Sequence, residues 1–121
     1  MRFVAATVFG AVLLVLGLYD GGSAQARHSR AVLLAAGDIA SCQSRGDRAT
    51  AKLLDSISGT VLALGDEAYP RGTAKEFDEC YDPTWGRFKD RTKPVPGNHE
   101  YNTEGAEGYF GYFGKGAGKP G

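Results

Sequence analysis

Three short polar blocks each follow an apolar run, and together they restrict the folds that this chain can adopt. The blocks are Gly37-Asp38, Gly65-Asp66-Glu67-Ala68-Tyr69 and Gly97-Asn98-His99-Glu100. Short continuous apolar runs are typical of strands buried in a parallel sheet. Ligands in such sheets bind beyond the carboxyl ends of the strands. We therefore expect the three blocks to meet at one edge of a parallel sheet.

The segments between the blocks predict an α/β fold in the order βαβαβ. A helix is expected from Ala49 to Ile57, with Asp47 as its cap, Gly59 as its stop and a Leu-Leu-Ile stripe packed on the sheet. The last strand is weak, because its two prolines cannot donate hydrogen bonds to a ladder. The expected strands are 31–36, 60–64 and 93–97.

Two further helical segments are expected after the second block. Thr73 and Glu76 have the spacing of a capping box, which predicts a short helix running towards Cys80. Residues 82–88 predict another helical turn, with Pro83 at its first position.

Aromatic residues are concentrated in the second half of the chain. Trp85 and Phe88 lie three residues apart, which favours core contacts over a ligand-binding platform. Four rings within 108–114 need a large apolar partner surface, and no later segment provides one. Three strands without closing elements predict a fold that is incomplete at its C-terminal end.

The charge balance gives no indication of a nucleic-acid partner. Fourteen basic and fourteen acidic residues leave no net charge. The most basic stretch, 87–93, is interrupted by Asp90, which favours a solvated helix face over a phosphate-binding one.

The N-terminal segment has the pattern of a secretory signal peptide. Arg2 precedes an apolar run over 3–19, and Ala24 and Ala26 form a small-residue cleavage site. The alternative is a retained anchor, although the run is short for a membrane span. We expect residues 1–26 to be removed and 27–121 to form a secreted or periplasmic protein without membrane attachment.

The chain has two cysteines, Cys42 and Cys80. An even number of cysteines in a chain expected to be exported favours a disulfide. A bridge of this loop length would stabilise the fold by about 4 kcal/mol. Two free thiols, or a metal-ligand role for Cys42 near Asp38, are the alternatives.

The polar blocks contain the groups that a hydrolytic metal centre uses. The Asp38 and Asp66 carboxylates would repel each other, and a pair of cations keeps both ionised. Asp66 could bridge two metals, Asn98 could add a neutral carbonyl ligand, and His99 could protonate a leaving oxygen. Taken singly, Asp38 could instead cap a loop, and the Asn98 block could be an ordinary turn.

In order and spacing, the blocks resemble the signature of the calcineurin-like metallophosphoesterase superfamily. Its Gly-Asp, Gly-Asp-x-x and Gly-Asn-His-Asp/Glu motifs each follow a strand, and here the motif residues Asp38, Asp66 and Asn98 are 28 and 32 positions apart. The block at 65–69 is similar to the purple-acid-phosphatase variant, and 81–101 resembles secreted bacterial members. The resemblance implies the N-terminal part of that family's α/β sandwich.

Carried over to this chain, the resemblance implies two metal ions, such as Fe, Zn or Mn. It makes Asp38 a ligand of the first metal, Asp66 the bridge and Asn98 a ligand of the second. His99 becomes the general acid or the group that orients the substrate. Tyr69 is either a first-metal ligand or a phenol packed beside the site.

The chain departs from the family pattern at two points. Ala40 stands where many members have a histidine, and the later histidine ligands, including a Gly-His-x-His motif, are absent. The function expected for the parent protein is metal-dependent hydrolysis of phosphate mono- or diesters, with residues 27–121 inactive or nearly so alone. The alternatives are a non-catalytic secreted fragment or pseudoenzyme, and a nuclease or nucleotidase of the same superfamily. The sequence assigns no oligomeric state.

Overall fold

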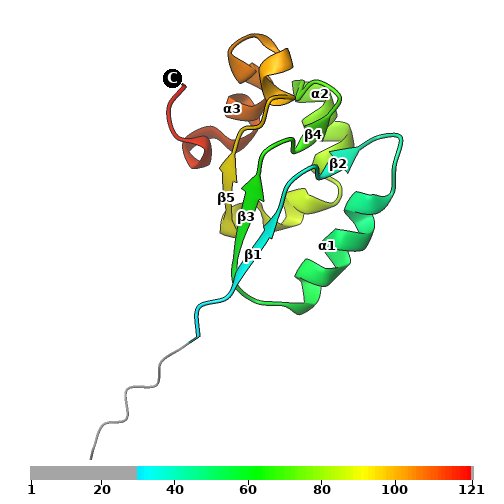
Figure 1. The fold of residues 1–121 in the computed structure, drawn as a ribbon, viewed down its shortest axis with the longest axis vertical. Coiled ribbons are helices and arrows are strands. Elements are labelled where there is room, and N and C mark those ends of the chain that lie inside the picture. The colour runs from blue at the N-terminus through cyan, green and yellow to red at the C-terminus, as the bar shows by residue number, and fades with distance from the viewer. Residues whose placement is uncertain (1–29, 121) are drawn as a thin grey trace, which may run out of the picture.

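A parallel three-stranded sheet forms the centre of the computed structural model, which describes residues 30–120. The strands are β1 (Leu33–Ala36), β3 (Thr60–Leu64) and β5 (Thr92–Val95), in the order β1-β3-β5. Figure 1 shows them side by side, with their carboxyl ends directed towards the same end of the molecule. The predicted α/β class is confirmed. The predicted signal segment, residues 1–26, lies outside the described residues.

Beyond the pairing of β1 with β3, the chain forms a second parallel ladder of two residues, which the sequence did not predict. It pairs β2 (Ala40–Ser41) with β4 (Ala68–Tyr69). Between the two ladders the first and second polar blocks stay joined, since Ile39 N–H donates to Asp66 O at 2.9 Å. The two backbone segments therefore stay paired in the same register from the first ladder to the second.

Helix α1 (Gly46–Ser56) connects β2 to β3 and packs on one face of the sheet (Figure 1). The prediction that Asp47 caps this helix is wrong: Arg45 occupies the N-cap position, and Asp47 lies buried in the first turn. The predicted stripe is also displaced. Leu54 is buried with Ala51, whereas Leu53 is 62% exposed. The helix starts three residues earlier than expected, and the face at 47, 51 and 54 turns inward.

Gly59 does not end α1 as predicted, because the helix already ends at Ser56 and Ile57 is extended. The glycine is needed at the entry to β3 instead. Its φ is +148°, and a Cβ there would lie 2.5 Å from the carbonyl oxygen of Val32. Close approach of two backbones explains this glycine.

The capping box is confirmed. Glu76 N–H donates to the Thr73 hydroxyl, and Thr73 N–H donates to the Glu76 carboxylate. This cap begins α2 (Ala74–Glu76), which continues as a π-helical turn over Phe77–Tyr81.

The prediction for Pro83 is wrong. The next helical segment begins at Trp85, so Pro83 lies in the turn before it and not at the first position of the helix. The remaining helices are the 3₁₀ segments Trp85–Arg91, Glu100–Asn102, Glu104–Ala106 and Gly114–Ala117, and α3 (Glu107–Phe113).

The aromatic segment does have a partner surface, contrary to expectation. Tyr109 and Phe113 of α3 are buried against Phe77 and Tyr81, with Phe113 5.8 and 5.7 Å from these two rings, centroid to centroid. The partner surface precedes the segment in the chain. Trp85 is buried in the same core, as predicted.

The two faces of the sheet differ in their cover. Val61 and Ala63 lie buried on the face of α1, whereas Leu33, Leu64 and Val95 are 65, 56 and 54% exposed. Leu64 and Val95 are paired residues, so they share a face. Within residues 30–120, no helix is long and apolar enough to cross a membrane.

Candidate metal-binding edge

The three polar blocks meet at the carboxyl ends of β1, β3 and β5, as the strand order predicts. Asp38 N–H donates to Gly65 O at 3.2 Å, which joins the first block to the second. His99 N–H donates to Asp66 Oδ1 at 2.9 Å, which joins the third block to the second. Residues from three separate parts of the sequence therefore form one continuous edge.

The Tyr69 hydroxyl lies between the two carboxylates of this edge. It donates a short hydrogen bond to Asp38 Oδ1 and lies 3.2 Å from Asp66 Oδ2. The hydrogen bond to Asp38, with partial burial and the charge of Asp66, raises the pKa of Tyr69. Asp38 and Asp66 form no salt bridge among residues 30–120. Two neighbouring carboxylates thus share a neutral phenol and lack a cationic side-chain partner.

His99 is held in a defined orientation. Its Nδ1 lies 2.7 Å from the carbonyl oxygen of Pro70, and its ring packs on Tyr69 at 4.3 Å between centroids. A carbonyl oxygen only accepts, so Nδ1 carries the hydrogen in this contact. The other ring nitrogen, Nε2, then remains for a ligand or a proton.

Asn98 lies beside His99 in the same loop and is exposed. Within the described part of the chain, its side chain makes no hydrogen bond that would fix its orientation. Of the five predicted site residues, Asp38, Asp66, Tyr69 and His99 are thus connected by contacts, and Asn98 is adjacent to them only through the backbone.

Asp38 and Asp66 share an uncommon backbone conformation. Their φ angles are +53° and +54°, in the left-handed region that non-glycine residues seldom occupy. Each such residue costs on the order of 1 kcal/mol or more. The same turn after two adjacent strands places both carboxylates at the edge of the sheet. Strain of this kind is concentrated at functional sites.

Two glutamates of the polar blocks are buried behind the edge, and the sequence reasoning assigned neither of them a role. Glu100 is fully buried and accepts three backbone hydrogen bonds. Glu67 is also fully buried, and its oxygens have no hydrogen-bond partner among the residues that the structure describes. Burial, then the neighbouring Glu100, raises the pKa of Glu67 to about 9. Their position inside the polar blocks that follow β3 and β5 was the available signal.

The donor set at the edge suits a hard cation. Asp38, Asp66 and Tyr69 offer carboxylate and phenol oxygens, and Asn98 can add an amide oxygen. Among residues 30–120, however, no three His, Cys, Asp or Glu side chains cluster as a metal-binding group. His99 supplies the imidazole of this part of the chain, and Ala40 is buried. The residues present therefore fit part of a metal centre, bound through oxygen.

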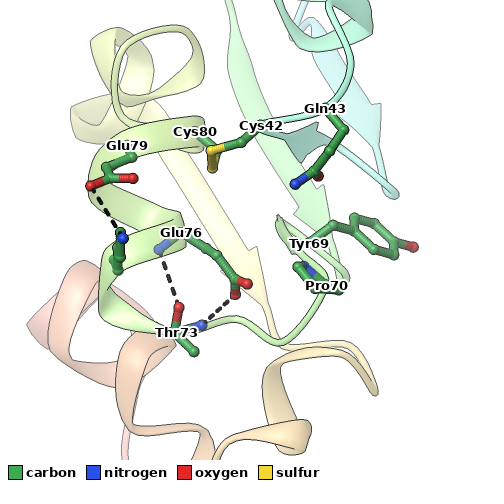
Figure 2. Close-up of a pocket in the computed structure, with 9 residues that line it drawn as sticks. Cys42, Gln43, Tyr69, Pro70, Thr73, Glu76, Glu79 and Cys80 are labelled. Atoms are coloured by element: carbon green, nitrogen blue, oxygen red, sulfur yellow. Dashed lines mark hydrogen bonds and ion pairs between the residues drawn. A yellow bond between two sulfur atoms is a disulfide. The ribbon is translucent and has the colours of Figure 1, made fainter.

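A disulfide joins Cys42 to Cys80, which confirms the bridge among the three alternatives for these cysteines. It connects the end of β2 to the π-helical turn, and β2 in turn pairs with β4 at Tyr69. The bridge forms one wall of a pocket of about 270 Å³ that also contains Gln43 and Glu76. Figure 2 shows the Tyr69 hydroxyl pointing away from the disulfide and α2. This pocket therefore borders Tyr69 on the side away from its hydroxyl group.

Comparison of the chain with protein-family models, with curated proteins and with solved structures finds no match.

Proposed function

We propose that this protein is a metal-dependent phosphoesterase that hydrolyses phosphate mono- or diesters, and that the edge formed by Asp38, Asp66 and Asn98 binds its metal ions. One observation carries the proposal. The Asp38 and Asp66 carboxylates lie around a single phenol hydroxyl, in strained backbone turns, and no cationic side chain of residues 30–120 forms a salt bridge with them. Paired carboxylates of this kind are stabilised by bound cations.

Each residue of the edge then has a defined task. Asp38, Asp66 and Asn98 hold the cations, and Asp66 is oriented for this by the His99 backbone N–H. The metal ions, when bound, supply charge neutralisation and an activated water to the phosphorus centre. His99, whose Nδ1 faces Pro70 O, offers Nε2 to the leaving oxygen of the substrate as hydrogen-bond or proton donor.

Tyr69 is proposed as a ligand of a trivalent metal such as Fe³⁺. In the present arrangement the phenol donates to Asp38, so Tyr69 would hold a metal as phenolate only after releasing this proton to solvent. A bound cation lowers the pKa of a coordinating acid, which reverses the effect of the two carboxylates. Zn²⁺ and Mn²⁺ are the other candidate ions for the oxygen ligands.

We propose further that this chain is the N-terminal part of a secreted phosphoesterase domain. Two observations support this. One face of the sheet leaves Leu33, Leu64 and Val95 more than half exposed. In addition, the described residues offer a single imidazole, whereas a dinuclear hydrolytic site takes several. The disulfide is typical of oxidising compartments, which agrees with export.

The test is the substitution Asp66→Asn, which keeps the shape of the side chain and removes its charge. In the intact protein we expect this substitution to lower the rate of Mn²⁺-dependent hydrolysis by a factor of about 100 or more. The substrates are p-nitrophenyl phosphate and bis-p-nitrophenyl phosphate. Asp90→Asn, at an exposed position away from the edge, is the matched control. Hydrolysis that survives Asp66→Asn would contradict the proposal.

The second candidate is a non-catalytic secreted fragment or pseudoenzyme, which the shortage of imidazole ligands favours. Its signature is Mn²⁺ binding that depends on Asp66 without phosphate-ester hydrolysis in the unchanged protein. Metal binding and hydrolysis measured on the same preparation therefore separate the two candidates.

A further inference from the structure

The second and third polar blocks approach each other more closely than side chains would allow. A Cβ on Gly97 would lie 2.1 Å from Asp66 Oδ1 and 2.4 Å from Asp66 N. A Cβ on Gly65 would lie 2.9 Å from the Gly97 Cα. The pairing of β3 with β5 ends at Leu64 and Val95, before this point. Something other than the strand ladder must hold the two loops together.

The His99 N–H bond to Asp66 Oδ1 is one connection, and Glu100 provides a second, larger one. Its Oε2 accepts hydrogen bonds from Asp66 N at 2.9 Å and Gly97 N at 2.8 Å, and its Oε1 accepts one from Ala68 N at 3.2 Å. Two of the donors belong to the second block and one to the third. A single side chain thus fixes backbone groups on both sides of the contact.

The glutamate is itself held firmly in place. It is fully buried, at the start of the 3₁₀ segment Glu100–Asn102. Its main chain lies against Gly72, where a Cβ would be 2.6 Å from the Glu100 Cα. Buried polar groups that are fully hydrogen-bonded restrict a structure to one arrangement. The position of the carboxyl group is therefore determined by the fold and not by solvent.

We propose that Glu100 is a positioning residue that locks the Asp66 loop against the Asn98 loop and thereby sets the metal affinity of the edge. The inference rests on the proposed function. Asp66 and Asn98 lie on opposite sides of this lock, so their separation depends on it. Outer residues that orient metal ligands change metal affinity by about 10- to 100-fold when substituted.

The need for two acceptor oxygens limits which side chains can replace Glu100. Three N–H donors converge on the carboxyl group, and both of its oxygens accept. In Glu100→Gln, the amide oxygen can face only one set of donors, because the NH₂ group donates and cannot accept. Glu100→Asp keeps both acceptor oxygens on a side chain one methylene shorter.

The experiment measures Mn²⁺ affinity and amide hydrogen exchange on the full 121-residue chain. Free Mn²⁺ is counted by its electron paramagnetic resonance signal, and exchange is followed by NMR. We expect Glu100→Gln to weaken Mn²⁺ binding 10- to 100-fold and to speed exchange at Asp66, Ala68 and Gly97, with Glu100→Asp intermediate. Glu104→Gln, at an exposed position, is the matched control and should change neither.

The outcomes separate this inference from the proposed function. A merely structural glutamate would lower the melting temperature but leave Mn²⁺ affinity unchanged below it, and that result would overturn the inference alone. Absence of Mn²⁺ binding by the unchanged chain would overturn the proposed function, and the inference with it. If Glu100→Gln does not fold, Glu100→Asp is judged by the same criterion. Unprotected amides at Asp66, Ala68 and Gly97 in the unchanged chain would also overturn the inference.

Discussion

The carboxylate edge and the aromatic core are assembled by different forces. At the edge, individual hydrogen bonds and close glycine contacts define the structure, such as the bond from His99 N–H to Asp66 and the approach of Gly97. In the core, rings of Phe77, Tyr81 and Phe113 pack at 5 to 6 Å between centroids. The edge therefore depends on specific atoms, and the core on buried area. Substitutions should affect the two regions in different ways.

The largest effect on stability is expected in the core. Phe77 is fully buried and contacts Tyr81, Tyr109, Tyr112 and Phe113. Phe77→Ala should lower the free energy of unfolding by about 4 kcal/mol, because it removes apolar contact and leaves a cavity. Urea denaturation followed by Trp85 fluorescence measures this loss.

Tyr101→Ala is the control for Phe77→Ala. Tyr101 is a large aromatic residue that is more than half exposed, so its removal should change stability by less than about 0.5 kcal/mol. Equal losses in the two variants would mean that the aromatic rings do not form the core described here.

The two regions also differ in how far the sequence could predict them. The edge was predictable because each polar block directly follows a strand, and parallel strands deliver their carboxyl ends to one place. Asp38, Asp66 and His99 were identified in this way. The hydrogen bonds of Glu100 were not predictable, because two of its three partners, Ala68 and Asp66, lie 32 and 34 residues away.

The core was harder to predict, for a related reason. The rings of α3 pack on Phe77 and Tyr81, about 30 residues earlier, and no local pattern indicates this pairing. The rotation of α1 was missed because the helix begins after Arg45 without a side-chain cap, so no capping residue marks its start. Local propensity predicted which elements form, whereas tertiary contacts decided how they end and which face they bury.

The disulfide lies between the two regions, so its removal should show how far they are coupled. Replacing Cys42 and Cys80 together by alanine should cost about 3 kcal/mol, mainly by relaxing the unfolded chain. This is less than the chain-entropy value of about 4 kcal/mol, because an unfolded chain retains some structure. Because Cys42 directly follows β2, and Ser41 pairs with Tyr69, we expect Mn²⁺ affinity to fall as well. The unchanged chain under reducing conditions should behave like the double variant. Loss of stability without any change at the edge would show that the regions are independent.

A smaller and more local effect is expected from Gly97→Ala. The added methyl group would overlap with the Asp66 side chain and backbone N, so the two loops must separate. We expect a stability loss of about 2 kcal/mol, of the size caused by overpacking, and a clear loss of Mn²⁺ affinity. Thermal unfolding and Mn²⁺ titration provide the two readouts.

Gly111→Ala is the matched control substitution, at a glycine next to the aromatic core. It lies in α3, and a Cβ there meets no atom within 4 Å. Alanine should stabilise this helix by about 0.5 to 1 kcal/mol without any effect on metal binding. If both glycine variants weakened Mn²⁺ binding to the same degree, close approach at Gly97 would not be the reason.

The smallest effect, and the most informative about pH, is expected from Tyr81→Phe. The Tyr81 hydroxyl is buried and has no hydrogen-bond partner within the described range 30–120. Burial, with the charge of Glu67, raises the pKa of Tyr81 well above the ordinary value of 10.0. The folded chain therefore keeps a proton that the unfolded chain loses, and stability falls as the pH rises above about 10. Tyr81→Phe should change stability at pH 7 by less than about 1 kcal/mol and should flatten this alkaline decline.

Tyr112→Phe is the control with a bonded hydroxyl. The Tyr112 hydroxyl donates to Asp82 at 2.6 Å, and its loss should cost about 1 kcal/mol at pH 7. Unfolding curves at pH 7 and pH 10.5 measure both variants, and an alkaline decline that Tyr81→Phe leaves unchanged would assign the titrating group to another residue.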